Sequence, residues 1–278
     1  MDAIITEEHL EAFRQGLLRQ EKSPATLEKY LRDVRAFWRY TGGRGVGKEL
    51  VMAYKSHLQQ AGYAPRSINS MLASVNSFLA SQGWEDCRVR TLKLQKPAYC
   101  PEEQELTREE YRRLLDAANL RPRLRLVMQT ICATGIRVSE LRYFTVENVT
   151  AGEVVVSCKG KTRVILVPGK LRKRLLAYIR REKIETGVIF RTRRGTPLDR
   201  RTIWAEMKAL CGTAGLVRAK VFPHNLRKLF ARSFYALDKD IAKLADILGH
   251  SSIDTTRIYI ITTGSEHRKK IERLGLVV

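Results

Sequence analysis

The chain has 278 residues, of which 51 are Lys or Arg and 29 are Asp or Glu, so its net charge is +22. This excess of positive charge indicates a polyanionic partner, usually nucleic acid, and a basic ribosomal or chromatin protein has a similar composition. No segment approaches the ~18 apolar residues of a membrane span, and the acidic, amphipathic N-terminus differs from signal and transit peptides. The five cysteines are scattered without a CxxC pair, which argues against a zinc site or disulfide framework and favours the cytoplasm.

The positive charge lies mainly in the C-terminal two thirds of the chain. Residues 1–95 have a net charge of +4, and residues 96–278 have a net charge of +18. Within the second part, the segment 159–201 contains 15 basic residues and three acidic ones. We therefore expect this segment to face DNA phosphates, and binding to weaken steeply as the salt concentration rises.

The first 90 residues are predicted to form a small helical bundle. Ser23 followed by Pro24 is typical of a helix start, and apolar side chains recur every three or four residues in the segment that follows. The glycine-rich stretch TGGRGVG and later Gly83 each end a helix. The predicted helices span residues 6–20, 24–40, 48–60 and 65–83.

Residues 91–106 contain two prolines and no periodic pattern, so we interpret them as a linker. Residues 107–278 are predicted to form a second domain, mainly helical with a small β-sheet. The β-branched runs EVVVS and RVILVP, joined by CKGKT, predict a hairpin of residues 153–157 and 163–168, and residues 187–192 are a third candidate strand. The predicted helices span residues 108–118, 122–134, 170–184, 199–211, 225–237, 240–248 and 252–260, and an amphipathic tail ends the chain.

The sequence lacks the motifs of two common kinds of DNA enzyme. A metal-dependent nuclease needs clustered carboxylates to hold Mg²⁺, and the acidic residues of the basic half are scattered. A P-loop for nucleotide binding is absent as well. We therefore expect no metal and no cofactor, and cationic side chains would have to stabilise a reacting phosphodiester.

Three short stretches can supply such cations. ATGIRVSEL places Arg137 directly after a Thr-Gly turn, and CKGKT places Lys159 at the tip of the hairpin. FPHNLRK puts His224 and Arg227 three residues apart, on one face of a helical turn. Taken singly, each stretch also fits an ordinary structural role: a surface arginine near a C-cap, a solvated turn lysine, or a polar helix start.

A fourth stretch, LGHSSIDTTRIY, contains His250 and, nine residues later, Tyr259. Most tyrosines on a short helix are core aromatics. Tyr259 is a nucleophile only if the cationic residues of the other stretches lie beside it.

Together, the four stretches resemble the tyrosine recombinases, the family of phage-type integrases and chromosome-dimer resolvases. The family pattern is an Arg in a TGxRxSEL box, a Lys in a β-hairpin, HxLR, LGH and then a Tyr about nine residues on, and every element occurs here in that order. The resemblance is strong over 107–260 and looser over 1–90. It implies an N-terminal helical, SAM-like core-binding domain and a mixed α/β catalytic domain with a C-terminal tail helix.

The resemblance also implies a role for each matching residue. The matching residues are the nucleophile Tyr259, the phosphate-binding pair Arg137 and Arg227, the hairpin general acid Lys159, the histidine-position residues His224 and His250, and the supporting acid Glu140.

These residue types suit cleavage of a phosphodiester. Two guanidiniums can bind the non-bridging oxygens and hold the added charge of the transition state. A tyrosine with a pKa of about 10 needs a nearby base or positive field to attack; His224 can accept the proton and His250 can bind the phosphate. A lysine ammonium can protonate the departing 5′-hydroxyl.

The hairpin departs from the pattern GKGxKxR that the family often has. The stretch CKGKTR is one residue shorter, with Cys158 in place of the glycine, so Lys159 is the preferred acid and Lys161 remains an alternative. Lys228 stands where many relatives have a second histidine. The basic residues that we expect to contact DNA are Lys161, Arg163, Arg193, Arg194, Arg200 and Arg201.

The expected function is site-specific recombination of double-stranded DNA through a 3′-phosphotyrosyl intermediate. We expect a homotetramer on paired DNA sites and a monomer when the protein is free. The expected location is the cytoplasm, in association with the nucleoid. Two alternatives stay open: a type IB topoisomerase-like or hairpin-forming relative, and a non-catalytic DNA-binding regulator derived from an integrase. In the tail, Ile271, Leu274 and Leu276 either pack on their own domain or dock on a neighbouring protomer. No motif specifies the DNA target, any accessory protein, or the choice among integration, excision, inversion and resolution.

Overall fold

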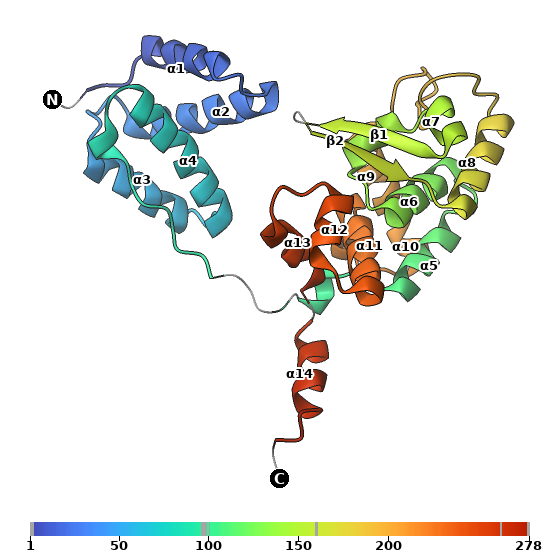
Figure 1. Cartoon of the computed structure of the whole chain (residues 1–278). Coiled ribbons are helices and arrows are strands. Elements are labelled where there is room, and N and C mark those ends of the chain that lie inside the picture. Colours follow the sequence, from blue (N-terminus) through green and yellow to red (C-terminus); the bar gives the residue numbers. More distant parts are fainter. Residues whose placement is uncertain (1–2, 96–98, 100, 159–160, 262, 277–278) are drawn as a thin grey trace. The chain divides into compact units, whose positions relative to one another are not determined.

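The computed structural model describes residues 3–95, 99, 101–158, 161–261 and 263–276. The chain divides into two compact units, Met1–Lys96 and Pro97–Val278 (Figure 1). The described residues are mostly helical and contain one two-stranded sheet, as the predicted fold class requires. Among these residues, no helix has the length and apolar composition needed to cross a membrane.

The first unit is a bundle of four helices. Ser23 caps the second helix by accepting a hydrogen bond from the Thr26 backbone N–H at 3.4 Å, and Gly42 ends it in the left-handed conformation, φ 57°. The rings of Phe13, Phe37 and Phe78 are fully buried in the core of this unit. The elements are α1 (Glu7–Arg19), α2 (Pro24–Thr41), α3 (Lys48–Gln60), α4 (Pro65–Ser81) and the 3₁₀ turn η1 (Glu85–Cys87).

The second unit surrounds a larger core with helices and one hairpin. Its elements up to the hairpin are η2 (Glu102–Gln104), α5 (Arg108–Ala117), α6 (Pro122–Thr134), η3 (Val138–Tyr143), α7 (Val146–Ala151), β1 (Glu153–Cys158) and β2 (Lys161–Leu166). The remaining elements are α8 (Gly169–Arg181), α9 (Arg200–Lys208), α10 (Cys211–Ala214), η4 (Arg218–Lys220), α11 (Pro223–Asp238), α12 (Ile241–Leu248), α13 (Ile253–Ile260) and α14 (Gly264–Glu272).

The β-branched runs form the predicted antiparallel hairpin, in which Val154 pairs with Ile165 and Cys158 with Lys161. Val154 and Val156 face the core, whereas Val155 between them is 49% exposed. This alternation is expected of a sheet that covers a core with one face.

The predicted third strand, residues 187–192, is not part of this sheet, and that prediction is wrong. Within the described residues this segment forms only isolated bridges, such as Thr145 with Val188. Its backbone bonds to the turn before α7 instead: the Ile189 N–H donates to the Phe144 carbonyl at 3.0 Å. A β-branched run therefore forms a ladder only where a neighbouring strand offers its edge.

Helix bounds differ from the predicted ones mainly after the hairpin. The predicted helix 199–211 ends at Lys208, and the short α10 follows as a separate turn. The helix α7 was not predicted, because six residues are too few to show an apolar repeat. The polar segment before the tail is helical from Gly264, since Thr263 and Glu266 form a capping box.

A small apolar cluster lies apart from the main core of the second unit. It consists of Ala231 on α11, Leu244 and Leu248 on α12, and Tyr259 on α13. The three helices pack against one another (Figure 1), and α11 also packs on α6. This arrangement brings the last two sequence motifs next to the end of α6.

Three apolar side chains in the described part of the C-terminal tail are exposed. Ile271 is 54% exposed, Leu274 62% and Leu276 82%. Arg232 on α11 holds the start of α14 through an ion pair with Glu266 at 3.0 Å. The tail is thus attached by charge at its first turn, while its apolar face is open to solvent.

Candidate active site

Arg137 is positioned by the sharp end of α6. Gly135 ends this helix with φ 65°, a conformation that favours glycine. A Cβ atom on Gly135 would lie 2.3 Å from the ring of Phe230 on α11, so the glycine also permits close contact between the two helices. Two residues later the chain is extended at Arg137 and enters η3. The Thr-Gly dipeptide therefore fixes where this arginine leaves the core.

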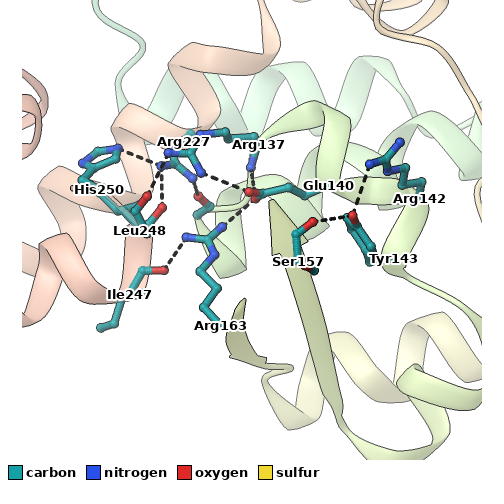
Figure 2. Close-up of polar contacts among 12 residues, drawn as sticks. Arg137, Glu140, Arg142, Tyr143, Ser157, Arg163, Arg227, Ile247, Leu248 and His250 are labelled. Carbon is teal, nitrogen blue, oxygen red and sulfur yellow. Dashed lines mark hydrogen bonds and ion pairs between the residues drawn. The ribbon is translucent and has the colours of Figure 1, made fainter. Parts of the chain in front are cut away.

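The carboxylate of Glu140 joins two arginines from distant parts of the chain (Figure 2). It accepts hydrogen bonds from Arg137 Nη1 at 3.0 Å and from Arg163 Nη2 at 2.6 Å, and also from the Arg137 backbone N–H at 2.7 Å. Glu140 is only 2% exposed. A buried carboxylate is stable only when it is paired, so the two guanidiniums neutralise it and it fixes their orientation.

The structure gives Arg163 a different surrounding from that of a surface DNA contact. Its side chain is 15% exposed, and Nη1 donates to the Ile247 carbonyl at 2.8 Å at the end of α12. The hairpin thereby holds the turn that precedes His250. The sequence predicts a DNA contact at Arg163, and the sequence alone does not show that β2 directs this residue towards Glu140 and α12.

Arg227 has the largest fully buried side chain among the residues that the structure describes, and it is 1% exposed. Its guanidinium donates to the Gly135 carbonyl, to the Leu248 carbonyl at 2.8 Å and to His250 Nε2 at 2.8 Å (Figure 2). It therefore connects the ends of α6 and α12. Burial, and next the charge of Arg137, lower the pKa of Arg227 to about 10, so this guanidinium is cationic at neutral pH.

Three of the predicted site residues lie against the ring of Tyr259. The ring centroids of His224 and His250 lie 5.1 and 4.9 Å from that of Tyr259, both edge-to-face. The Arg227 guanidinium carbon lies 5.8 Å from the same ring. Although Tyr259 is only 8% exposed and belongs to an apolar cluster, its neighbours include one buried cation and two imidazoles.

Both histidines are held neutral at physiological pH. Partial burial, followed by the charges of Lys228 and Arg227, lowers the pKa of His224 to about 4. Burial, followed by Arg227 and Arg137, lowers the pKa of His250 to about 4. A neutral imidazole can accept a proton, and the surrounding positive charge that keeps it neutral also favours an anionic substrate.

Thr256 is a site residue that the sequence analysis missed. It is fully buried, and its hydroxyl oxygen lies 2.9 Å from His250 Nδ1. It precedes Tyr259 by three residues and so shares one face of α13 with it. That spacing in TTRIY was the signal that could have identified it.

The other predicted residues lie outside the centre or outside the described structure. Lys159 is not among the described residues, and the side chain of Lys161, the first residue of β2, is also outside them. The structure therefore does not choose between these two lysines. The predicted DNA contacts that are exposed are Arg193, Arg194, Arg200 and Arg201.

Arg200 is the one of these exposed arginines whose charge contributes to the lowered pKa of His224. It lies at the first position of α9, after the cap Asp199. Among the residues that the structure describes, no three His, Cys, Asp or Glu side chains lie close enough together to hold a metal ion. The candidate site thus contains arginines, two imidazoles, one tyrosine, the buried carboxylate of Glu140 and the hydroxyl of Thr256.

The chain is similar to known proteins over both of its units. Residues 104–265 match the model of the phage integrase family, and residues 10–85 match the N-terminal SAM-like domain of phage integrases. Tyrosine recombinase XerA of Thermococcus kodakarensis is 30% identical over 97% of this chain and 96% of its own length. Tyrosine recombinase XerD of Staphylococcus aureus is 29% identical over 89% of this chain and 91% of its own.

Solved structures show the same fold. A crystal structure of XerA recombinase covers 97% of this chain and 98% of its own, with 24% identity and a TM-score of 0.54. A lambda integrase tetramer bound to a Holliday junction covers 93% of this chain and 78% of its own, with 20% identity and a TM-score of 0.76. The fold and the site define a two-unit protein with a tyrosine set among cations. The chain belongs to the phage integrase family, and it is a tyrosine recombinase like the curated relatives that it matches.

Proposed function

We propose that this protein is a site-specific DNA recombinase in which Tyr259 cuts one strand and keeps the end as a 3′-phosphotyrosyl link. The observation that carries the proposal is the contact of the Tyr259 ring with His224, His250 and Arg227. His224 and Arg227 lie on α11, His250 lies in the turn after α12, and Tyr259 lies on α13. An ordinary core tyrosine does not need two imidazoles and a guanidinium as neighbours.

In the proposed step, the Tyr259 oxygen attacks the phosphorus, the bond to the 5′-oxygen breaks, and the phenolic proton passes to neutral His224. Arg137 and Arg227 bind the non-bridging oxygens, because a guanidinium offers paired donors to a phosphate. The Nε–H of Arg227 is buried and has no hydrogen-bond partner within the described residues, and a phosphate oxygen would satisfy it. An unpaired buried donor costs about 1–3 kcal/mol, so substrate binding would offset this cost.

The departing 5′-oxygen would take its proton from Lys159, with Lys161 as the alternative. The phosphotyrosyl link stays reactive, because a phenolate is a far better leaving group than an alkoxide. The 5′-hydroxyl of another strand can attack this link and give its proton to the hairpin lysine, which reseals the backbone. As the phosphotyrosyl bond breaks, His224 returns its proton to the Tyr259 oxygen. Each step exchanges one phosphate ester for another, so the proposed cycle needs no ATP. The cationic side chains supply the charge stabilisation that a metal ion provides in other enzymes of this kind.

We propose that four protomers act together on two paired duplex sites. Two features support this assembly: a fold shared with a lambda integrase tetramer bound to a Holliday junction, and the open apolar face of Ile271, Leu274 and Leu276. Docking of this tail on a neighbouring protomer would cover that face. Whether the outcome is integration, excision or resolution would depend on how the two sites are arranged.

A nicked duplex tests the nucleophile. On a site with a nick close to the cleavage position, the short leaving strand diffuses away and the covalent complex accumulates. Tyr259→Phe should bind this DNA normally and form no adduct, because only the hydroxyl is removed. Tyr235→Phe, a partly buried tyrosine on α11 beside the same apolar cluster, is the matched control and should form adduct like the wild type. Adduct formation by Tyr259→Phe would refute the proposal.

A further inference from the structure

Among the described residues of the first unit, one carboxylate is buried: Asp33 on α2, whose side chain is 3% exposed. Oδ2 lies 2.9 Å from Lys29 Nζ and accepts a hydrogen bond from the Ser74 hydroxyl at 3.1 Å. Oδ1 accepts two hydrogen bonds from Arg32, from Nη2 at 3.0 Å and from Nε at 3.3 Å. Both oxygens of this carboxylate are therefore engaged, one by α4 and Lys29, the other by a single arginine.

The lysine of this cluster is fully used inside the protein. Lys29 Nζ donates to the Ser70 carbonyl at 2.7 Å and to the Ser74 hydroxyl at 2.9 Å, in addition to its ion pair with Asp33. An ammonium has three donors, and all three are occupied. Lys29 therefore ties α2 to α4, and it has no donor left for a phosphate or a base.

Arg32 differs from Lys29, because its guanidinium is bound to Asp33 although its side chain is exposed. Its side chain is 70% exposed, and an ion pair at that exposure adds little stability. Neighbouring residues of a helix do not face one another, so the side chain bends back to reach Asp33. The consequence of the pair is orientation: an exposed arginine, which ordinarily samples many rotamers, has its guanidinium fixed by a buried carboxylate.

The donors that remain on Arg32 form a fork that points away from Asp33. A guanidinium has five N–H groups; the Nε–H and one Nη2–H are bound to Oδ1, which leaves both Nη1–H groups and the second Nη2–H. One N–H of Nη1 and the remaining N–H of Nη2 point in the same direction at the end of the guanidinium. Together they can donate to two acceptor atoms that lie side by side. In the DNA major groove, guanine presents such a pair as O6 and N7, and bidentate arginine is its commonest reader.

The surroundings of Arg32 suit the edge of a duplex. Arg32 lines a hollow of about 460 Å³ between α2 and the start of α4, together with Arg39, Tyr63, Ser67 and Ser70. Asp33 is the only acidic residue among those that line it, and its charge is already compensated. A groove of arginine, hydroxyl and aromatic side chains offers both phosphate and base contacts.

We propose that Arg32 is a specificity-determining residue that reads a guanine in the recombination site, with Asp33 as the positioning residue that orients its guanidinium. This inference rests on the proposed function, since it assigns one base contact to the DNA complex of that enzyme. It differs from the general positive charge of the protein, which attracts any DNA sequence equally.

The test uses the full chain with Tyr259→Phe, so that binding is measured without covalent capture. A library of random duplexes is selected for binding, and the preferred base at each position is compared among variants. Arg32→Ala should abolish one guanine preference, lowering the affinity for the guanine-containing site by about 5- to 150-fold, the range for a lost bidentate contact. Its affinity for unrelated DNA should change little. Arg32→Lys should lose the same preference, because an ammonium lacks the fork.

Two further variants test whether Asp33 orients Arg32, as opposed to stabilising the fold, and whether the effect of Arg32→Ala comes only from the loss of a positive charge. Asp33→Asn should weaken the same guanine preference and no other, and it should add nothing to Arg32→Ala in the double variant. If Asp33 only stabilises the fold, its loss would lower the melting temperature and the affinity for all sequences alike, which would refute its positioning role. Arg35→Ala removes an exposed arginine of the same helix, and it should leave every base preference unchanged.

The two proposals fail in different ways. A protein that selects no preferred sequence from the library contradicts the proposed site-specific function. A protein that selects a clear site, and whose Arg32→Ala variant selects the same site with unchanged base preferences, contradicts the role of Arg32 alone.

Discussion

Arg227 Nη2 lies 2.8 Å from His250 Nε2, and this contact fixes the protonation of the imidazole. A guanidinium carries only donors, so Nε2 accepts, and the single proton of the neutral ring is on Nδ1, shared with the Thr256 hydroxyl 2.9 Å away. His250 therefore cannot donate from Nε2 to a phosphate while Arg227 is bound to it. We expect substrate binding to redirect the guanidinium and to exchange this contact for phosphate contacts.

The two hairpin lysines can be distinguished by the chemistry of the leaving group. We expect Lys159→Ala to slow cleavage of an ordinary strand strongly, because the 5′-oxygen then leaves unprotonated. A strand with sulfur in place of that bridging 5′-oxygen should restore the rate, since a thiolate, with a conjugate-acid pKa of about 8.5, leaves without an acid. Lys161→Ala is the matched control. Rescue of Lys161→Ala instead would assign the general acid to Lys161.

Arg163 should act on the site and not on DNA binding. Because it holds Glu140 and the turn before His250, Arg163→Ala should slow cleavage on the order of 100-fold by displacing the catalytic groups. The dependence of the binding constant on salt should keep its slope, whereas loss of one phosphate contact lowers that slope by about 0.9. Arg200→Ala, the exposed arginine at the start of α9, is the comparison. If Arg163→Ala cleaves normally and the salt dependence of its binding constant has a reduced slope, Arg163 is a DNA contact and not a residue that positions the site.

Gly249 should tolerate no side chain. It has φ 64°, and a Cβ atom would lie 2.7 Å from Arg163 Nη1. Gly249→Ala should therefore lower the free energy of unfolding by about 1–2 kcal/mol, because alanine is strained in the left-handed conformation. The added methyl group should also displace Arg163. Gly42→Ala has the same strain, φ 57°, with nothing within 4 Å. Urea unfolding should show the larger loss for Gly249→Ala, and the excess should vanish in the Arg163→Ala background; an equal loss for both glycines would contradict the contact.

The stability of the protein should fall as the pH drops from 6.5 towards 4. The pKa of His224 and that of His250 are each lowered to about 4 in the fold, while the unfolded chain binds these protons near pH 6.5. Between the two values the unfolded state binds more protons, so the free energy of unfolding rises with pH there and is unaffected by these groups above 6.5. Urea unfolding at pH 5 and 7 measures this. The variant with both His224 and His250 changed to Asn should lose the part of the pH-dependence that these histidines cause. If its free energy of unfolding changes with pH as steeply as that of the wild type, the lowered pKa values of the two histidines are contradicted.

Much of the fold could be predicted because its signals are local. The caps Ser23 and Thr107 mark the starts of α2 and α5, and the β-branched runs give the hairpin. The segment 187–192 has the same local pattern and forms no third strand, because strand pairing depends on a partner elsewhere in the chain. The apolar repeat of a segment indicates which secondary structure it can form, and the segments that pack against it determine which one it does form.

The order of motifs predicts the residues of the candidate site from the sequence alone, since each motif carries its own turn or helix start, as Gly135 does for Arg137. Which side chains meet was decided only by tertiary structure. The sequence did not reveal that Arg163 faces Glu140, that Thr256 supports His250, or that Asp33 holds Arg32. The first two depend on how the helices and the hairpin pack, and the third on whether a carboxylate is buried. Local chemistry is encoded residue by residue, whereas burial and the choice of partner belong to the folded chain as a whole.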